Sequence, residues 1–383
     1  MLTAEGCSAR RERLWNALPT PCDTLVVGDP SHLTYFTGYY PSPFEFRTAE
    51  SGAMLVMEPG RATLVADNVL QPYLDASFAD EIVAPTWYEA KASATHRRMK
   101  LVASVLARMA AIPGKRIGVE LAAVPAGVVE GLRAARPGLE IVDISPIIRP
   151  LRRSKDADEL SVIRRSIAAG EAGQAAALAE VRPGMTERDA YLIVQRAAFE
   201  SLGAQAIVYG DFASGPRCET DRGGPPTSRT IERGDLLLLD FSVVVSNYRG
   251  DFTNTFAVGS EPSSGQIRLF EACVGAMKAA EAKLKPGAAC RDVDAACRGH
   301  LASLGLEERF GSHTGHGLGL GHPEPPYLVR ESDESLVVGD VVAIEPGLYV
   351  GGVGGMRFER NYLITRDGFE ILSNHEIRLT QIN

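Results

Sequence analysis

Residues 234–251 read GDLLLLDFSVVVSNYRGD, and this stretch decides how the rest of the chain is interpreted. Four leucines lead into Asp240, which is the pattern of a buried strand that ends on a carboxylate. A second run, rich in β-branched residues, carries Asp251, and the turn residues Ser246 and Asn247 lie between the two runs. The pattern predicts a β-hairpin in which Asp240 and Asp251 face each other across two strands.

The same arrangement returns about a hundred residues later. Residues 339–345 read GDVVAIE, with a carboxylate in the position that Asp240 has in the first run. A glycine-rich stretch centred near Gly352 then separates Glu345 from Glu359. We therefore expect Glu345 and Glu359 to oppose each other across a second hairpin.

Each hairpin is preceded by a related stretch that opens a helical pattern. Residues 181–189 read VRPGMTERD, and residues 284–292 read LKPGAACRD. We interpret this as an internal duplication in which two helices and a hairpin occur twice. Two such halves related by a pseudo-twofold axis would place four carboxylates together. Because buried negative charges in that number are unstable alone, the site requires cations.

A glycine-rich loop before the second hairpin contains His313, His316 and His322. A single histidine there would be as easily structural as functional, but three beside four opposed carboxylates favour a functional site. Bridging carboxylates suit two divalent ions about 3.5 to 4 Å apart. The oxygen-rich donor set favours Mn²⁺, with Co²⁺, Fe²⁺ or Zn²⁺ as alternatives. No other cofactor is indicated.

Composition narrows the class of protein. The chain has 383 residues and 45% hydrophobic content, which indicates two domains, expected at residues 1–150 and 151–383. The net charge of -8 is spread without basic clusters, so nucleic acid is not an expected partner. No apolar run is long enough for a membrane span and the first residues lack the apolar core of a secretion signal, so we expect a soluble, cytoplasmic protein.

At this point the sequence resembles the pita-bread metallopeptidases, which include aminopeptidase P, prolidase and methionine aminopeptidase. The resemblance covers nearly the whole chain. Residues 29–38, DPSHLTYFTG, resemble the creatinase-type N-terminal domain, which methionine aminopeptidases lack. The resemblance implies an α/β (α+β) fold, with a creatinase-type domain at 1–150 and a duplicated pita-bread catalytic domain at 151–383. It also implies a homodimer. The matching ligand positions, in order, are Asp240, Asp251, His316, Glu345 and Glu359.

The resemblance also assigns a role to each residue. Asp240 would chelate one ion, Asp251 and Glu359 would bind both ions, and His316 and Glu345 would complete the other ion's site.

Further roles concern the reaction. Glu345 would handle the proton of the attacking water, and His322 would stabilise the tetrahedral oxyanion. Arg357 would orient a metal ligand, and His313 would lie near the ligands or the substrate.

Three positions depart from the family pattern. His316 and His322 are six residues apart where seven is usual, and His313 precedes His316 by three residues where four is usual. The prolyl-peptide enzymes also carry a histidine about eleven residues before the glycine of the first Gly-Asp pair, and Gly223 occupies that position here.

The sequence leaves three functions open. The first is a dinuclear metal hydrolase, an Xaa-Pro aminopeptidase or dipeptidase acting on a small peptide. The second is a metal-dependent hydrolase of a small non-peptide substrate with a C–N bond, as in the creatinase and ectoine hydrolase relatives. The third is a non-catalytic binding protein on the same fold, which the complete set of five ligands argues against.

Overall fold

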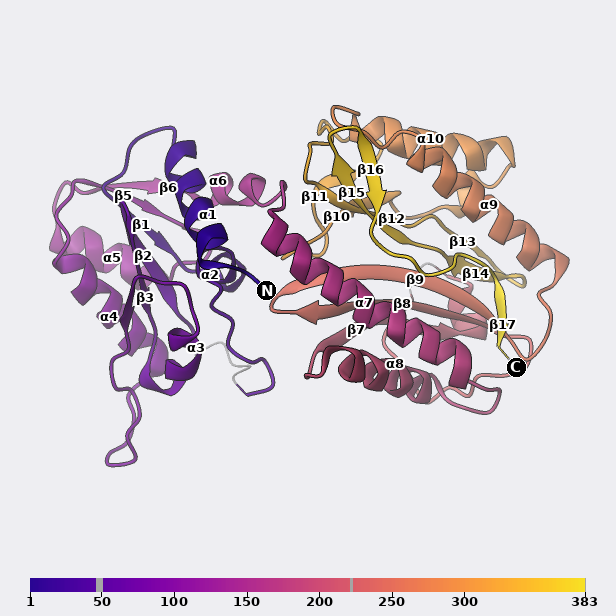
Figure 1. The fold of residues 1–383 in the computed structure, drawn as a ribbon, viewed down its shortest axis with the longest axis horizontal. Coiled ribbons are helices and arrows are strands. Elements are labelled where there is room, and N and C mark those ends of the chain that lie inside the picture. Colours follow the sequence, from indigo (N-terminus) through magenta and orange to yellow (C-terminus); the bar gives the residue numbers. More distant parts are fainter. Residues whose placement is uncertain (46–50, 221–222, 383) are drawn as a thin grey trace. The chain divides into compact units, whose positions relative to one another are not determined.

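The computed structural model describes residues 1–45, 51–220 and 223–382. The chain forms two compact units, Met1–Arg152 and Arg153–Asn383. Both units combine strands with helices (Figure 1), so the expected α/β class is confirmed. In the part of the chain that the structure describes, no helix combines the length and the apolar character that crossing a membrane requires.

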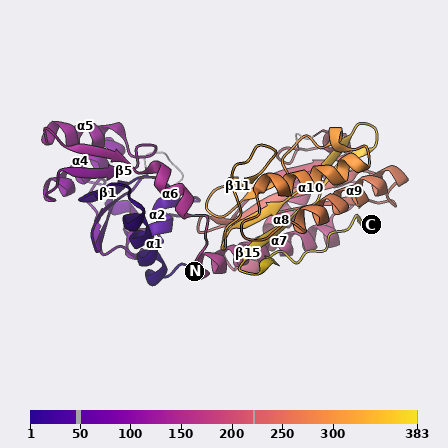
Figure 2. The same cartoon turned by 90° about the horizontal axis from the view of Figure 1, so that it is seen from above.

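The first unit is built on one six-stranded sheet. The sheet lies between α4 and α5 on one side and α1 and α2 on the other, as Figures 1 and 2 both show. The strands β1 and β2, and β2 and β3, pair antiparallel, while the remaining neighbours are parallel. The strand order across the sheet is β4 (Glu81–Val83), β3 (Arg61–Val65), β2 (Met54–Glu58), β1 (Thr24–Val27), β5 (Arg116–Val119) and β6 (Glu140–Asp143).

Apolar side chains of this sheet pack against α4 and α5, so that the core of the first unit lies on that face. On the other face, Asp29 caps α2 by accepting a hydrogen bond from the Ser31 N–H at 2.8 Å, and Gly38 ends α2 in a left-handed conformation. The helices of this unit are α1 (Ala4–Ala17), α2 (Pro30–Thr37), α3 (Gln71–Asp75), α4 (Arg97–Ala110), α5 (Ala126–Ala135) and α6 (Ser145–Leu151), with the 3-10 turn η1 (Asn68–Leu70).

The second unit contains three sheets and two pairs of helices. In Figure 1 the pair α7–α8 and the pair α9–α10 lie on opposite sides of the strands. The helices are α7 (Ala157–Glu180), α8 (Glu187–Leu202), α9 (Ser264–Glu281) and α10 (Cys290–Ser303), with the 3-10 turns η2 (Gly215–Cys218) and η3 (Glu307–Arg309).

The first sheet has the order β17 (Thr380–Ile382), β9 (Tyr248–Val258), β8 (Leu236–Val245) and β7 (Ile207–Ser214). The second has the order β11 (Glu324–Leu328), β10 (Gly315–Gly317), β12 (Val341–Ile344), β15 (Arg360–Thr365) and β16 (Gly368–Ile371). The third is a hairpin of β13 (Gly347–Val350) and β14 (Gly354–Arg357).

The element order supports the internal duplication. Two helices precede the β8–β9 hairpin, and two helices precede the strands that flank Glu345 and Glu359. The β8–β9 hairpin turns at Ser246 and Asn247, which both have positive φ angles, as the sequence predicts. Thr186 and Asp189 form a capping box at the start of α8.

The long helix α7 packs closely against β9. Gly170 of α7 faces Phe252 so closely that an added Cβ would lie 1.8 Å from that ring. Gly250 of β9 approaches Ile167 in the same way, with an added Cβ 3.2 Å from the Ile167 Cα. Because glycine allows this close approach, the strand that carries Asp251 is held firmly against α7.

Candidate metal centre

Asp240 and Asp251 are carried by the paired strands β8 and β9. Asp240 pairs in register with Thr253, and Asp251 pairs with Ser242. The two aspartates are therefore diagonal neighbours, whereas the sequence predicted that they would face each other directly. Because the offset is an even number of residues, both side chains still lie on the same face of the sheet.

The second pair of carboxylates flanks the β13–β14 hairpin. Glu345 follows the last residue of β12 and Glu359 follows β14, and the pairing of Gly347 with Arg357 brings the two glutamates to the same end of the hairpin. The Glu359 N–H donates to the Thr253 carbonyl at 3.1 Å. This bond joins the second hairpin to the first, so the two halves contribute to one site.

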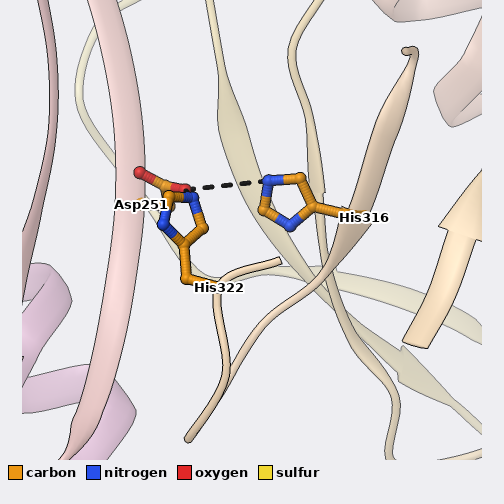
Figure 3. A group of neighbouring side chains, drawn as sticks. All are labelled: Asp251, His316 and His322. Carbon is orange, nitrogen blue, oxygen red and sulfur yellow. Dashed lines mark ion pairs between the residues drawn. The ribbon is translucent and has the colours of Figure 1, made fainter. Parts of the chain in front are cut away.

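Three histidines surround these carboxylates. His316 lies on β10, with Nε2 3.1 Å from Glu345 Oε1 and 3.8 Å from Asp251 Oδ2. His313 Nε2 lies 2.9 Å from Glu345 Oε1, and His322 Nε2 lies 2.5 Å from Asp251 Oδ2. Figure 3 shows Asp251 and His316 directed toward each other, with His322 beside Asp251. The loop therefore brings all three histidines to the carboxylates despite its unusual spacing.

The tautomer of His316 is fixed by a hydrogen bond to the backbone carbonyl of the next residue, Gly317. Its Nδ1 is 2.9 Å from the Gly317 carbonyl oxygen, which can only accept a hydrogen bond. The proton therefore resides on Nδ1, and Nε2 is left as the ligand atom.

The donor set fits divalent cations. Ligand atoms of Asp240, Asp251 and Glu359 lie within 4.8 Å of one another, and so do those of His313, His316 and Glu345. Glu359 is buried, and its Oε1 has no hydrogen-bond partner among the residues described. A buried carboxylate oxygen without a partner is unfavourable unless a cation binds it.

The pKa shifts within the cluster also indicate that it needs bound cations. Burial raises the pKa of Asp240 to about 7 against the opposing charge of Arg357. Burial and the nearby carboxylates Asp251 and Glu345 raise the pKa of Glu359 well above its ordinary range. Burial would lower the pKa of His316, but its hydrogen bond to Glu345 and the charge of that carboxylate raise it to about 9. Without cations, the cluster therefore retains protons that metal ions would displace.

Arg357 orients one ligand, as the sequence suggested. Its guanidinium contacts Asp240 in a short ion pair, and its Nε donates to the Tyr349 hydroxyl at 2.9 Å. Burial opposes the charge of Arg357, but the Asp240 carboxylate raises the pKa of this guanidinium well above its ordinary value. Asp240 is thus held by a permanent cation behind it.

A series of hydrogen bonds that joins residues of β7 and β9 to His322 was not predicted from the sequence. Arg249 Nη1 donates to the Tyr209 hydroxyl at 2.8 Å, and that hydroxyl lies 3.1 Å from His322 Nδ1. The Asp251 carboxylate, 2.5 Å from His322 Nε2, can only accept a hydrogen bond, so Nε2 carries a proton, and in the neutral imidazole Nδ1 then accepts from the Tyr209 O–H. The proton of His322 is then on Nε2, which points at the carboxylates. Pairing of β7 with β8 was the signal that could have placed Tyr209 here.

The cluster opens into a cavity of about 250 Å³. Tyr209, Asp211, Pro323 and Arg357 line it together with the three histidines and with the candidate ligands Asp240, Asp251 and Glu345. The cavity therefore has room for a small substrate directly beside the carboxylates.

This arrangement defines a metal-dependent hydrolase assembled from two duplicated halves. The model of metallopeptidase family M24 matches residues 161–366, and the creatinase/prolidase N-terminal domain model matches residues 15–154. The chain belongs to metallopeptidase family M24, so the expected resemblance is confirmed, and it depends on divalent metal ions.

Relatives support this assignment. An Xaa-Pro dipeptidase of Pyrococcus horikoshii is 32% identical over 266 residues, which cover 69% of this chain and 75% of that protein. The crystal structure of the prolidase from Pyrococcus horikoshii superposes with a TM-score of 0.79 at 26% identity and covers 98% of this chain and 99% of that chain. An Xaa-Pro dipeptidase from Bacillus anthracis shares the fold, with a TM-score of 0.81 at 24% identity over 99% of this chain and 100% of that chain.

Proposed function

We propose that this protein is a dinuclear metal-dependent hydrolase that removes the N-terminal residue from an Xaa-Pro peptide. The observation that carries the proposal is the convergence of four carboxylates and an imidazole, from both halves of the duplication, in one cluster that borders a cavity. The named activity of the Pyrococcus horikoshii relative supports the prolyl peptide as substrate. The proposed ligands are Asp240, Asp251, His316, Glu345 and Glu359.

Two divalent ions bound there would lower the pKa of a water molecule and polarise the scissile carbonyl. Glu345 is proposed to accept the proton of the attacking water, because its buried carboxylate borders the cavity. Its hydrogen bond from His313 and its contact with His316 overcome the effect of burial and keep the pKa of Glu345 well below its ordinary value. His313 thereby positions Glu345 and helps to keep it ionised.

His322 is proposed to stabilise the oxyanion of the tetrahedral intermediate. Its Nδ1 is held by the Tyr209 hydroxyl at 3.1 Å, which leaves the proton on Nε2. When Asp251 serves as a metal ligand, Nε2 loses its present partner and can donate to the carbonyl oxygen of the substrate.

The oxygen-rich donor set supports Mn²⁺ as the native ion, ahead of Co²⁺, Fe²⁺ and Zn²⁺. We also propose a homodimer, which the family resemblance supports, and a cytoplasmic location. Sedimentation of the purified protein tests the first of these, and fractionation of cells tests the second.

A second candidate function is hydrolysis of a small non-peptide C–N substrate. The specific observation in its favour is that Gly223 replaces the histidine usual in prolyl-peptide enzymes, and that the neighbouring Asp211 lines the cavity.

An activity screen separates these functions. We expect the Mn²⁺-loaded protein to release the first residue of Xaa-Pro peptides and to lose that activity when a chelator removes the metal. Metal binding without turnover of any prolyl peptide would reject the first candidate in favour of the second.

A further inference from the structure

The wall of the cavity beside Asp240 carries a carboxylate that is not one of the proposed ligands. Asp211 lies on β7 and pairs in register with Asp240 on β8. Its side chain is 30% exposed, whereas that of Asp240 is 14% exposed. Asp211 belongs to none of the groups of side chains close enough to share a metal ion among the residues described. Its carboxylate therefore faces the space that a substrate would occupy.

Gly223 makes this placement of Asp211 feasible. A Cβ added at Gly223 would lie 2.0 Å from Asp211 Oδ2, and Gly223 has a φ of +26°. The next residue, Gly224, donates its N–H to Asp211 Oδ1 at 2.8 Å. A histidine at position 223, as in the prolyl-peptide enzymes that this chain resembles, would collide with Asp211. The Asp211 carboxylate therefore occupies space that is free only because residue 223 is glycine.

The other charged groups of the cavity leave Asp211 available to a substrate. Asp240, Asp251 and Glu345 are proposed to bind metal. Arg357 is the one arginine or lysine among the described residues that line the cavity. It makes its short ion pair with Asp240, while its Nη1 is 3.9 Å from Asp211 Oδ2.

We propose that Asp211 is a specificity-determining residue that binds a cationic group of the substrate, an ammonium or a guanidinium. This inference rests on the proposed function and names its substrate class as peptides or amides with a positive charge near the scissile bond. A carboxylate near the scissile bond would be repelled by Asp211. The enzyme therefore prefers a cationic peptide to an uncharged peptide of the same size, and an amide to a free acid.

The test compares kcat/KM for peptides that differ only in charge. Lys-Pro-Ala-amide and Ala-Pro-Lys-amide are each paired with the peptide that carries norleucine in place of lysine, and Ala-Pro is paired with its amide. We expect a preference of about tenfold to a hundredfold for lysine in at least one of the two positions, the scale of a hydrogen bond between charged groups. In Asp211→Asn the ratio of the two kcat/KM values falls to about one, because the side chain no longer carries a charge. The asparagine amide oxygen still accepts the hydrogen bond from Gly224.

Asp333→Asn is the matched control, since Asp333 is exposed and lies outside the cavity. It keeps the lysine preference of the parent. Thermal unfolding shows whether Asp211→Asn is folded, and Asp211→Ser, which also retains an acceptor for Gly224, replaces it if it is not. Equal turnover of lysine and norleucine peptides by the parent, or a preference that survives in the Asp211 variant, overturns the inference alone. Failure of the loaded parent to cleave any of the peptides overturns the proposed function as well.

Discussion

Asp240 and Asp251 lie diagonally across the β8–β9 hairpin, with Asp240 opposite Thr253 and Asp251 opposite Ser242. This offset places Asp251 nearer to the strands of the second half, where its N–H donates to Asn361 Oδ1 at 3.0 Å. Asp251 thus lies close to Asp240 and Glu359 and also to His316, which is the arrangement that a bridging carboxylate requires.

Removal of Asp251 is expected to disable the site. Asp251→Ala removes the carboxylate that lies close to Asp240, Glu359 and His316, so bound metal should fall from about two equivalents to fewer than one, and peptide turnover should fall by at least about a thousandfold. Elemental analysis and a peptide assay measure both effects. Asp367→Ala, at an exposed turn, serves as the control. Unchanged activity of the Asp251 variant would reject the proposed site.

His322 is expected to act on the reaction rather than on the metal. His322→Ala should retain both ions and lower kcat by about two to three orders of magnitude, because one donor to the oxyanion is lost. Tyr209→Phe should lower kcat less, since it removes only the hydrogen bond to Nδ1. Elemental analysis measures the bound metal, and steady-state kinetics measure kcat. Loss of the metals from the His322 variant would mean that this histidine is a ligand.

The sequence predicted the hairpins, because strand patterns and turn residues are local signals. It did not predict the diagonal register. Ser246 and Asn247 lie one position beyond the midpoint between the aspartates, and in an antiparallel hairpin this shifts the pairing by two residues.

The neighbouring strand β7 shows a second limit. The pattern of apolar residues predicts a strand over residues 206–209 only, with a loop rich in glycine and proline after it. In the structure β7 continues to Ser214, because these residues pair with β8. For this reason Asp211 was absent from the sequence-based site.

The close contact between α7 and β9 predicts a stability change. Gly170→Ala would push a methyl group into Phe252, and we expect overpacking to cost about 1 to 3 kcal/mol of unfolding free energy. Gly299→Ala in α10 is the matched control. An added Cβ meets nothing within 4 Å there, so helix propensity should stabilise the protein by about 0.5 to 1 kcal/mol. Urea unfolding measures both. Equal effects of the two substitutions would contradict the packing of α7.

His375 predicts an acid-sensitive stability. Burial and the charge of Arg360 lower the pKa of His375 from 6.5 to about 4. The folded state therefore disfavours the proton, and the stability associated with neutral His375 is present above about pH 6.5 and is lost as the pH falls toward 4. Between pH 7 and pH 5 the parent should lose about 2 kcal/mol more unfolding free energy than His375→Phe. Urea unfolding at both pH values checks this, and parallel losses would refute it.

The central claim is that carboxylates from two duplicated hairpins share a pair of divalent ions. Calorimetric titration of the metal-stripped protein with Mn²⁺ measures this most directly. We predict saturation at two ions per chain, and a reduced stoichiometry when a ligand is removed from either half, as in Asp240→Ala or Glu359→Ala. Absence of Mn²⁺ binding by the parent, or saturation at two ions in both variants, would contradict the shared site.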